Sequence, residues 1–176
     1  MQEWRRTPGA GRYAHPERER RFVVSGEFPA AEQTWLIEDR YIDGTSLRLR
    51  RVSVGGEAVW KLTQKVRPNP DDPASVSITN VYLTAEEYGR LATLPAATLR
   101  KVRHVCAVDG TPFVVDVFDG DLAGLRLAEV EVADHTAPIE LPGWLGEEVT
   151  YDDRYSGGRL ARMTPAEIKA LPAFTN

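Results

Sequence analysis

The sequence predicts an antiparallel β-barrel of eight strands with a few peripheral helices, a mainly β fold of the α+β class. Five short segments alternate charged and apolar residues with a period of two, which is typical of half-buried strands. Turn signals are dense and helix signals are few, as in closed antiparallel sheets. If the charged faces point inward, the barrel encloses a tunnel lined by acids and bases. The five segments are Glu17–Arg21, Arg48–Arg50, Lys61–Lys65, Lys101–Arg103 and Glu129–Glu131.

Turn residues separate the predicted strands. Gly55-Gly56 and Asp109-Gly110 are typical of tight hairpins. Arg67–Pro73 contains three prolines, which forbid a continuous strand ladder, so it predicts a long hairpin connection. It is followed by a further strand-like run, Ser77–Tyr82. The other predicted strands with clear turn boundaries cover residues 46–54, 57–66, 101–108, 112–118 and 124–133.

Helix signals occur at three places. Capping boxes, a Ser or Thr followed three residues later by Glu, begin at Thr84 and Thr164. They predict helices over about residues 84–94 and 164–171. A third short helix is predicted over residues 30–35.

Length and charge limit the classes of protein that this chain represents. At 176 residues it is long enough for one domain with a real core, predicted over residues 15–176 after a mobile polar tail at 1–14. The net charge of −4 argues against a protein that coats nucleic acid or an anionic membrane. A single cysteine, Cys106, excludes an internal disulfide. With no membrane span and no secretory signal expected, we predict a cytoplasmic monomer or homodimer.

The acids form two pairs, each with both carboxylates on one face of a strand. Glu17 and Glu19 are one pair, and Glu129 and Glu131 are the other. Four carboxylates around one cavity would repel each other unless cations intervene, and Mg²⁺ or Mn²⁺ prefers such oxygen ligands. The alternative is a solvated strand face, which the flanking arginines favour for the first pair. Apolar neighbours make that alternative weaker for the second pair.

The bases also form pairs on one strand face. Arginine offers a two-pronged donor to phosphate and lysine a compact charge, so a convergent set suits a linear triphosphate. The alternative is ion pairing across an exposed sheet, worth roughly 0.2–1 kcal/mol per pair. Asp116 is a lone acid within an apolar strand, either paired with a base or part of the site. The predicted phosphate-binding bases are Arg48, Arg50, Lys61, Lys65, Lys101 and Arg103.

In order along the chain, these motifs resemble the CYTH superfamily, the triphosphate tunnel metalloenzymes. The segment Glu17-Arg18-Glu19-Arg20-Arg21 resembles the family's ExExK signature. It is followed by Tyr41-Ile42 and by the basic pairs, then by Asp116-Val117-Phe118 and Glu129-Val130-Glu131. The resemblance covers about residues 15–162 and implies an eight-stranded antiparallel tunnel that binds triphosphates with Mg²⁺ or Mn²⁺.

The resemblance also implies roles for individual residues. Glu17, Glu19, Glu129 and Glu131 would hold metal ions or position water. Lys61 is added to the phosphate-binding set from its place on the strand rather than from a family position. Arg21 stands where the family has a catalytic lysine, and Tyr41 matches the tyrosine that acts with it. Arginine keeps the charge but does not exchange protons near neutral pH.

Two other positions depart from the family pattern. The strand over residues 77–82 lacks the acids that many members carry before the middle helix, and Ser156-Gly157-Gly158 replaces an asparagine-containing stretch. The leading hypothesis is metal-dependent hydrolysis of an inorganic, nucleoside or other organic triphosphate. Two alternatives stay open, an adenylyl cyclase of class IV and a non-catalytic module that binds polyphosphate or nucleotide. The sequence does not rank the substrates or the metals.

Overall fold

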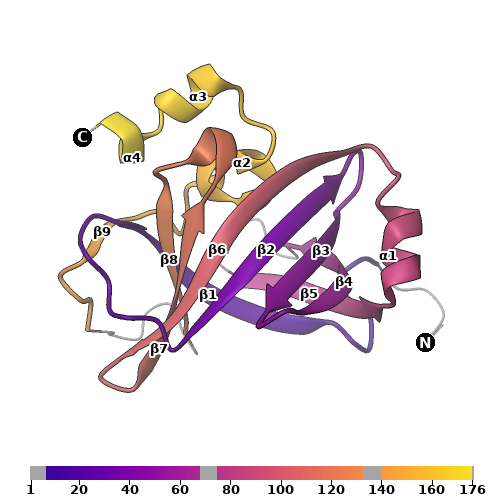
Figure 1. Ribbon diagram of the computed structural model, residues 1–176, viewed down its shortest axis with the longest axis horizontal. Helices are drawn as coiled ribbons and strands as arrows, with labels where there is room; N and C mark the ends of the chain where they lie inside the picture. The colour runs from indigo at the N-terminus through magenta and orange to yellow at the C-terminus, as the bar shows by residue number, and fades with distance from the viewer. Residues whose placement is uncertain (1–6, 68–74, 133–139, 176) are drawn as a thin grey trace.

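A computed structural model describes residues 7–67, 75–132 and 140–175 and shows a single antiparallel sheet (Figure 1). Eight of its strands close into a barrel, as predicted, and the ninth pairs with the end of the first. The strands are β1 (His15–Val24), β2 (Gln33–Ile42), β3 (Leu47–Val54), β4 (Glu57–Val66), β5 (Ser75–Leu83), β6 (Ala96–Val108), β7 (Thr111–Phe118), β8 (Arg126–Glu131) and β9 (Leu145–Glu148).

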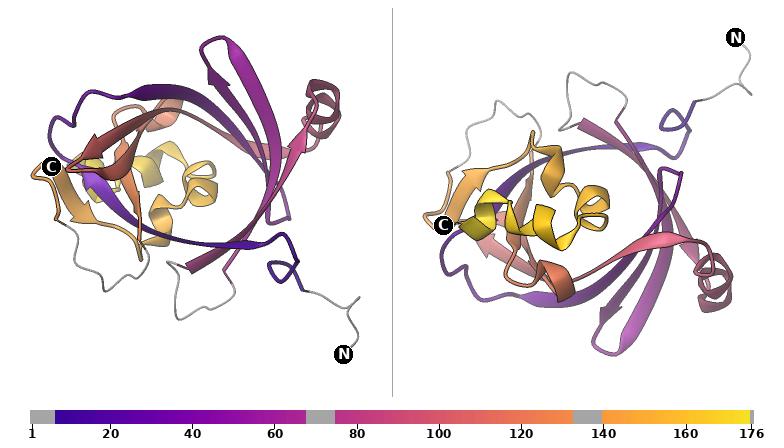
Figure 2. Two further views of the ribbon diagram at one scale, coloured as in Figure 1. Left: turned by 90° about the horizontal axis from the view of Figure 1, so that it is seen from below. Right: turned by 90° about the horizontal axis from the view of Figure 1, so that it is seen from above.

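The barrel closes through β1, which contacts β5 and β8 along its length. Residues His15 to Arg18 pair with β5, and Glu19 to Val23 pair with β8. The order around the ring is therefore β1, β5, β4, β3, β2, β6, β7, β8 and again β1. Figure 2 shows this ring from both ends, with the C-terminal helices lying within its outline.

Two hairpin turns form where the sequence predicts them. Gly55 and Gly56 join β3 to β4 with φ of 57° and 90°, and Asp109 and Gly110 join β6 to β7 with φ of 49° and 79°. Two central residues with positive φ give a turn whose twist matches that of the flanking strands. Glycine reaches these angles without a steric penalty, and aspartate is among the residues that tolerate them best.

The described helices are short and lie outside the sheet or across one end of it. Both predicted capping boxes are present, because Thr84 and Thr164 each exchange hydrogen bonds with the glutamate three residues later. The helices are α1 (Ala85–Leu91), α2 (Gly157–Leu160), α3 (Pro165–Lys169) and α4 (Pro172–Thr175), with 3₁₀ turns η1 (Gly120–Leu122) and η2 (Asp153–Tyr155).

The prediction of a helix over residues 30–35 is wrong. Strand β2 already begins at Gln33, and the Glu32 N–H donates to the Val105 carbonyl at 2.8 Å. A ladder of ten residue pairs between β2 and β6 outweighs the weak local helix preference.

Two predicted segments fall partly outside the described residues. Residues 1–6 of the predicted tail lie outside them, and residues 7–14 form turns in which the Gly9 carbonyl accepts from Ser77 Oγ at 2.6 Å. The mobility of the tail stays a prediction. Of the proline-rich connection, residues 68–73 also lie outside the described range.

The apolar core lies at one end of the barrel, beneath the C-terminal segment. Leu99, Phe118 and Leu127 from the strands pack with Tyr155, Leu160, Ile168 and Leu171 from that segment. A second cluster lies on the outer face of the sheet, around Phe22, Phe113 and Val130. We call residues 153–171 the C-terminal cap, because they fill this end of the barrel and leave the charged part of the lumen free. None of the described helices is long and apolar enough to cross a membrane.

Candidate functional site

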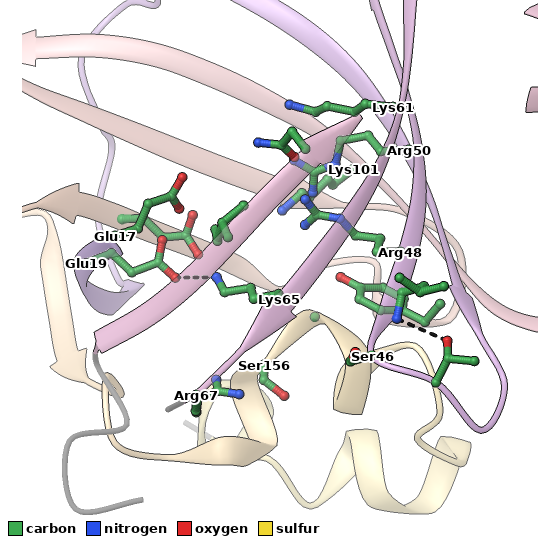
Figure 3. A pocket seen from close by; sticks show the side chains of 18 of the residues that line it. Glu17, Glu19, Ser46, Arg48, Arg50, Lys61, Lys65, Arg67, Lys101 and Ser156 are labelled. Carbon is green, nitrogen blue, oxygen red and sulfur yellow. Dashed lines mark hydrogen bonds and ion pairs between the residues drawn. The ribbon is translucent and has the colours of Figure 1, made fainter. Parts of the chain in front are cut away.

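The barrel lumen contains a cavity of about 370 Å³ beside the C-terminal cap. Nine lysine and arginine side chains and three glutamates line it, so the cavity carries excess positive charge. Figure 3 shows Glu17 and Glu19 on one side, with Arg48, Arg50 and Lys61 across from them. The cations are Arg21, Arg48, Arg50, Lys61, Lys65, Arg67, Lys101, Arg103 and Arg162; the glutamates are Glu17, Glu19 and Glu129.

A chain of alternating charges crosses the lumen through Arg21. Arg21 Nη2 lies 2.7 Å from Glu19 Oε1, and Arg21 Nε donates to Glu129 Oε1 at 2.9 Å. Glu19 Oε1 also accepts from Lys65 Nζ at 3.3 Å, and Glu129 Oε2 accepts from Arg103 Nη2 at 2.9 Å. Burial favours the neutral form of Glu129, but Arg21 and Arg103 outweigh it and hold its pKa well below the usual range.

Asp116 lies behind the cavity and supports two of its cations. Its carboxylate accepts two hydrogen bonds of 2.7 Å from Arg103 and a further one from Lys101. Asp116 is 2% exposed, and burial alone would raise its pKa, but the two bases lower it overall. The acid fixes the direction of both side chains, which is the structural pairing that the sequence left open beside a direct site role.

Asp39 has the same supporting function on β2, which is separated from the strand of Asp116 by β6 alone. It is 1% exposed and accepts from Arg50 Nε at 2.6 Å and Arg50 Nη2 at 2.7 Å. Arg48 Nε lies 3.7 Å from the same carboxylate, so Arg48 is only loosely paired. Against the cost of burial, Arg50 and Arg48 lower the pKa of Asp39. This two-pronged pair presents Arg50 in a fixed position.

Two cations retain free donor capacity for a ligand. Arg48 Nε is buried and has no hydrogen-bond partner among the described residues. Lys61 has no ion-pair or hydrogen-bond partner in the same part of the chain, and it faces Arg50 across the β3–β4 pair. Burial and the nearby Arg50 and Arg48 lower the pKa of Lys61. An anion in the cavity would satisfy both groups.

The four predicted metal ligands are not equivalent. Glu131 pairs with Glu19 across β8 and β1 but is exposed and does not line the cavity. Within the described ranges, no group of three or more His, Cys, Asp or Glu side chains is arranged to hold a metal ion. Glu129 is fully engaged by arginines. Glu17 has no ion-pair partner in these ranges, and burial, opposed by Lys65, raises its pKa.

Tyr41 joins the cavity to the C-terminal cap. Burial raises its pKa to about 12, so the hydroxyl stays protonated near neutral pH. A Cβ at Gly157 would lie 2.1 Å from that hydroxyl, so only glycine fits there. Arg162 holds the cap in place, because it donates to the Tyr41 carbonyl at 3.0 Å and to the Gly158 carbonyl at 3.0 Å.

Most residues predicted for the site line this one cavity; Asp116 and Glu131 do not. Sequence reasoning missed Asp39, although its place two residues before Tyr41 puts both on one strand face. It also missed Arg67 and Arg162, which lie outside the alternating segments and gave no such signal. Ser156 and Gly157, noted only as a departure from the family pattern, line the cavity as well.

Two curated proteins resemble parts of this chain, whereas no protein-family profile matches it. An inorganic triphosphatase from Acetivibrio thermocellus is 38% identical over 64 residues, which are 36% of this chain and 41% of that protein. An inorganic triphosphatase from Nitrosomonas europaea is 46% identical over 59 residues, 32% of this chain and 39% of that protein. The matched region thus spans about two fifths of each relative.

Solved structures match over more of the chain. The crystal structure of the inorganic triphosphatase NE1496 has a TM-score of 0.60 and 29% identity, covering 85% of this chain and 96% of that one. A conserved hypothetical protein from Pyrococcus furiosus, at 18% identity and TM-score 0.51, covers 69% of this chain and 81% of its own and shows the fold alone. With the closed tunnel and the ordered motifs, the likeness to the inorganic triphosphatases supports a CYTH domain in this chain, the domain type of the triphosphate tunnel metalloenzymes.

Proposed function

We propose that this domain hydrolyses a triphosphate inside its tunnel. The proposal rests on the lumen cavity, in which nine basic side chains face three glutamates. Its volume of about 370 Å³ lies within the range of small-molecule sites. The resemblance to proteins named inorganic triphosphatases supports the same reaction class.

The cations would grip the phosphate chain from nearby strands of the lumen wall, with β3 and β4 on one side of β2 and β6 on the other. Arg50 and Arg103 are held by buried carboxylates, so they meet the ligand already oriented. Arg48 and Lys61 have free donor capacity, so a phosphate oxygen would complete their hydrogen bonding. Fixed donors aimed at developing negative charge stabilise a phosphoryl-transfer transition state without much reorganisation.

Tyr41 and Arg21 would contribute without exchanging protons. The raised pKa of Tyr41 keeps its hydroxyl as a hydrogen-bond donor toward a phosphate oxygen. Arg21 supplies a permanent positive charge at the wall formed by β1 and β8. Loss of the family's lysine is compatible with hydrolysis, because this chemistry depends mainly on position and charge.

A divalent cation, Mg²⁺ or Mn²⁺, would bind beside Glu17. This carboxylate has no ion-pair partner among the described residues, and Glu19 Oε2 on the same face is also free there. Such an ion would neutralise phosphate oxygens and polarise the phosphorus. A cytoplasmic location and a monomeric or dimeric state stay predictions.

The test measures phosphate release from inorganic triphosphate with Mg²⁺, Mn²⁺ or EDTA, comparing wild type with Arg48→Gln. Losing one charge-assisted phosphate contact costs about 1.5–3 kcal/mol, roughly a ten- to hundredfold fall in kcat/KM. Asp39 keeps Arg50 as its partner, so the variant retains its fold. The matched control is Arg90→Gln, at an exposed position on α1.

Three outcomes decide between the candidate functions. Release that needs a divalent cation and falls in Arg48→Gln supports hydrolysis. In a parallel assay with ATP, formation of cyclic nucleotide and pyrophosphate without phosphate release would replace hydrolysis with cyclisation. Tight, salt-sensitive binding of triphosphate without turnover would leave a binding module.

A further inference from the structure

We infer that the Arg21 guanidinium takes the place of a divalent cation between Glu19 and Glu129, so that these two carboxylates do not form a metal site. The inference rests on the proposed function only in that the same tunnel would accept a metal-bound triphosphate. It concerns how many cations the protein itself must bind.

The position of Arg21 is the first reason. It projects from β1 directly opposite Glu129 on β8, with Glu19 two residues earlier on the same face. Its Nη2 atom lies 2.7 Å from Glu19 Oε1 and 2.8 Å from Glu129 Oε1. One positive group therefore bridges two carboxylates from neighbouring strands, which is the place a bridging metal ion would require.

The second reason is that the carboxylate oxygens facing this point are already in use. Glu129 Oε1 accepts from Arg21, and Glu129 Oε2 accepts from Arg103. Glu19 Oε1 is shared by Arg21 and Lys65. A divalent ion would have to displace two fixed guanidinium groups to gain the same oxygens.

The third reason is that Arg21 is anchored from behind and cannot leave easily. It is 9% exposed, its Nη1 donates to the Tyr155 carbonyl in the cap, and its backbone N–H donates to Thr150 Oγ1 at 2.9 Å. Guanidinium stays charged at all working pH values, so it does not give way by losing a proton. Displacing it would leave a buried charge without its partners.

The consequence is a separation of roles among the predicted metal ligands. Glu129 holds cationic side chains in position, and metal binding is left to the side of the lumen that carries Glu17. Glu129 should therefore be dispensable for Mn²⁺ binding, although it is needed to orient Arg21 and Arg103.

The experiment titrates Mn²⁺ into the protein without substrate and follows free Mn²⁺ by electron paramagnetic resonance. Wild type is compared with Glu129→Gln, Arg21→Gln and the double variant, and exposed Glu57→Gln serves as the control. Thermal unfolding of each variant is recorded alongside, so that misfolding is detected directly.

We expect Glu129→Gln to leave Mn²⁺ affinity and stoichiometry unchanged. We expect Arg21→Gln to gain about one Mn²⁺ per chain, and the double variant to lose it, because two facing carboxylates with no cation between them form an oxygen site. A fall of about tenfold or more in Mn²⁺ affinity in Glu129→Gln alone would show that Glu129 takes part in Mn²⁺ binding, and it would overturn the inference.

If Arg21→Gln does not fold, the Glu129→Gln titration still decides. The result is also separable from the proposed function. A protein that shows this Mn²⁺ pattern but releases no phosphate refutes hydrolysis and leaves the assignment of Arg21 intact. A protein that hydrolyses triphosphate but loses Mn²⁺ affinity in Glu129→Gln refutes the assignment alone.

Discussion

Replacing Asp39 with asparagine should destabilise the empty protein strongly and make its stability depend on an anionic ligand. Asp39 is 1% exposed, and its two oxygens accept from Arg50 at 2.6 and 2.7 Å. Asparagine keeps the shape but not the charge. Arg50, itself 7% exposed, would then lie buried beside Arg48 without a counter-charge.

The expected magnitude follows from the burial of this pair. Removing one partner of a buried ion pair costs about 3–5 kcal/mol. In a chain of this length, 1 kcal/mol lowers Tm by roughly 2–4 °C, so a fall of about 6–20 °C is expected. Because a bound triphosphate supplies the missing negative charge, it should raise Tm more in the variant than in wild type.

The assay is thermal unfolding of both proteins with and without inorganic triphosphate. The matched control is Asp43→Asn, whose exposed ion pair with Arg162 should contribute less than about 1 kcal/mol. A free energy of unfolding of Asp39→Asn within 1 kcal/mol of wild type would show that Asp39 does not stabilise Arg50 as a buried ion pair. So would equal stabilisation of both proteins by triphosphate.

The remaining predictions concern single features of the tunnel. Lys61→Met should raise KM for triphosphate about tenfold, since a charged contact is lost. The free energy of unfolding should not fall, because Lys61 lies among like charges. Gly157→Ala should lower the free energy of unfolding by about 1–3 kcal/mol, because the new methyl group meets Tyr41 Oη. The pKa values of Asp39 and Asp116 are lowered on folding, so their contribution is complete above the unfolded pKa and is lost as pH falls. Acid titration of stability should therefore show a decline below about pH 4 that is shallower in Asp39→Asn.

Controls make these outcomes specific. Lys169→Met changes an exposed lysine and should leave KM unchanged. Gly89→Ala in α1 meets no atom within 4 Å and should be neutral or stabilising. An unchanged KM in Lys61→Met would remove that residue from the binding set, and an unperturbed Gly157→Ala would contradict the close packing of the cap against Tyr41.

The barrel was predictable because its strands carry their pattern locally. Alternation in Arg48–Arg50 and Lys61–Lys65, with two-residue turns at Gly55-Gly56 and Asp109-Gly110, determines which faces point inward. The helix expected over residues 30–35 failed for the opposite reason. The local helix signal there is weak, and residues 33–35 belong to β2, whose pairing with β6, distant in sequence, decided their conformation.

The candidate site was predictable in composition but not in its internal pairing. The alternation of side chains along each strand predicts that Glu19, Arg21 and Glu129 face the lumen. The structure shows in addition that Arg21 lies between the two acids. This alternation does not show where each residue lies along the axis of a barrel with tilted strands. For that reason Glu131, on the same face as Glu129, falls outside the cavity lining, and the approach of the cap at Gly157 had no sequence signal.

Phosphorus NMR of inorganic triphosphate, in the presence of the purified protein and Mg²⁺ or Mn²⁺, tests the proposed hydrolysis directly. We expect the triphosphate signals to give way to pyrophosphate and phosphate in wild type and Arg90→Gln, and far more slowly in Arg48→Gln. Triphosphate that stays intact with wild type at saturating metal would contradict this expectation, as would equal turnover in Arg48→Gln.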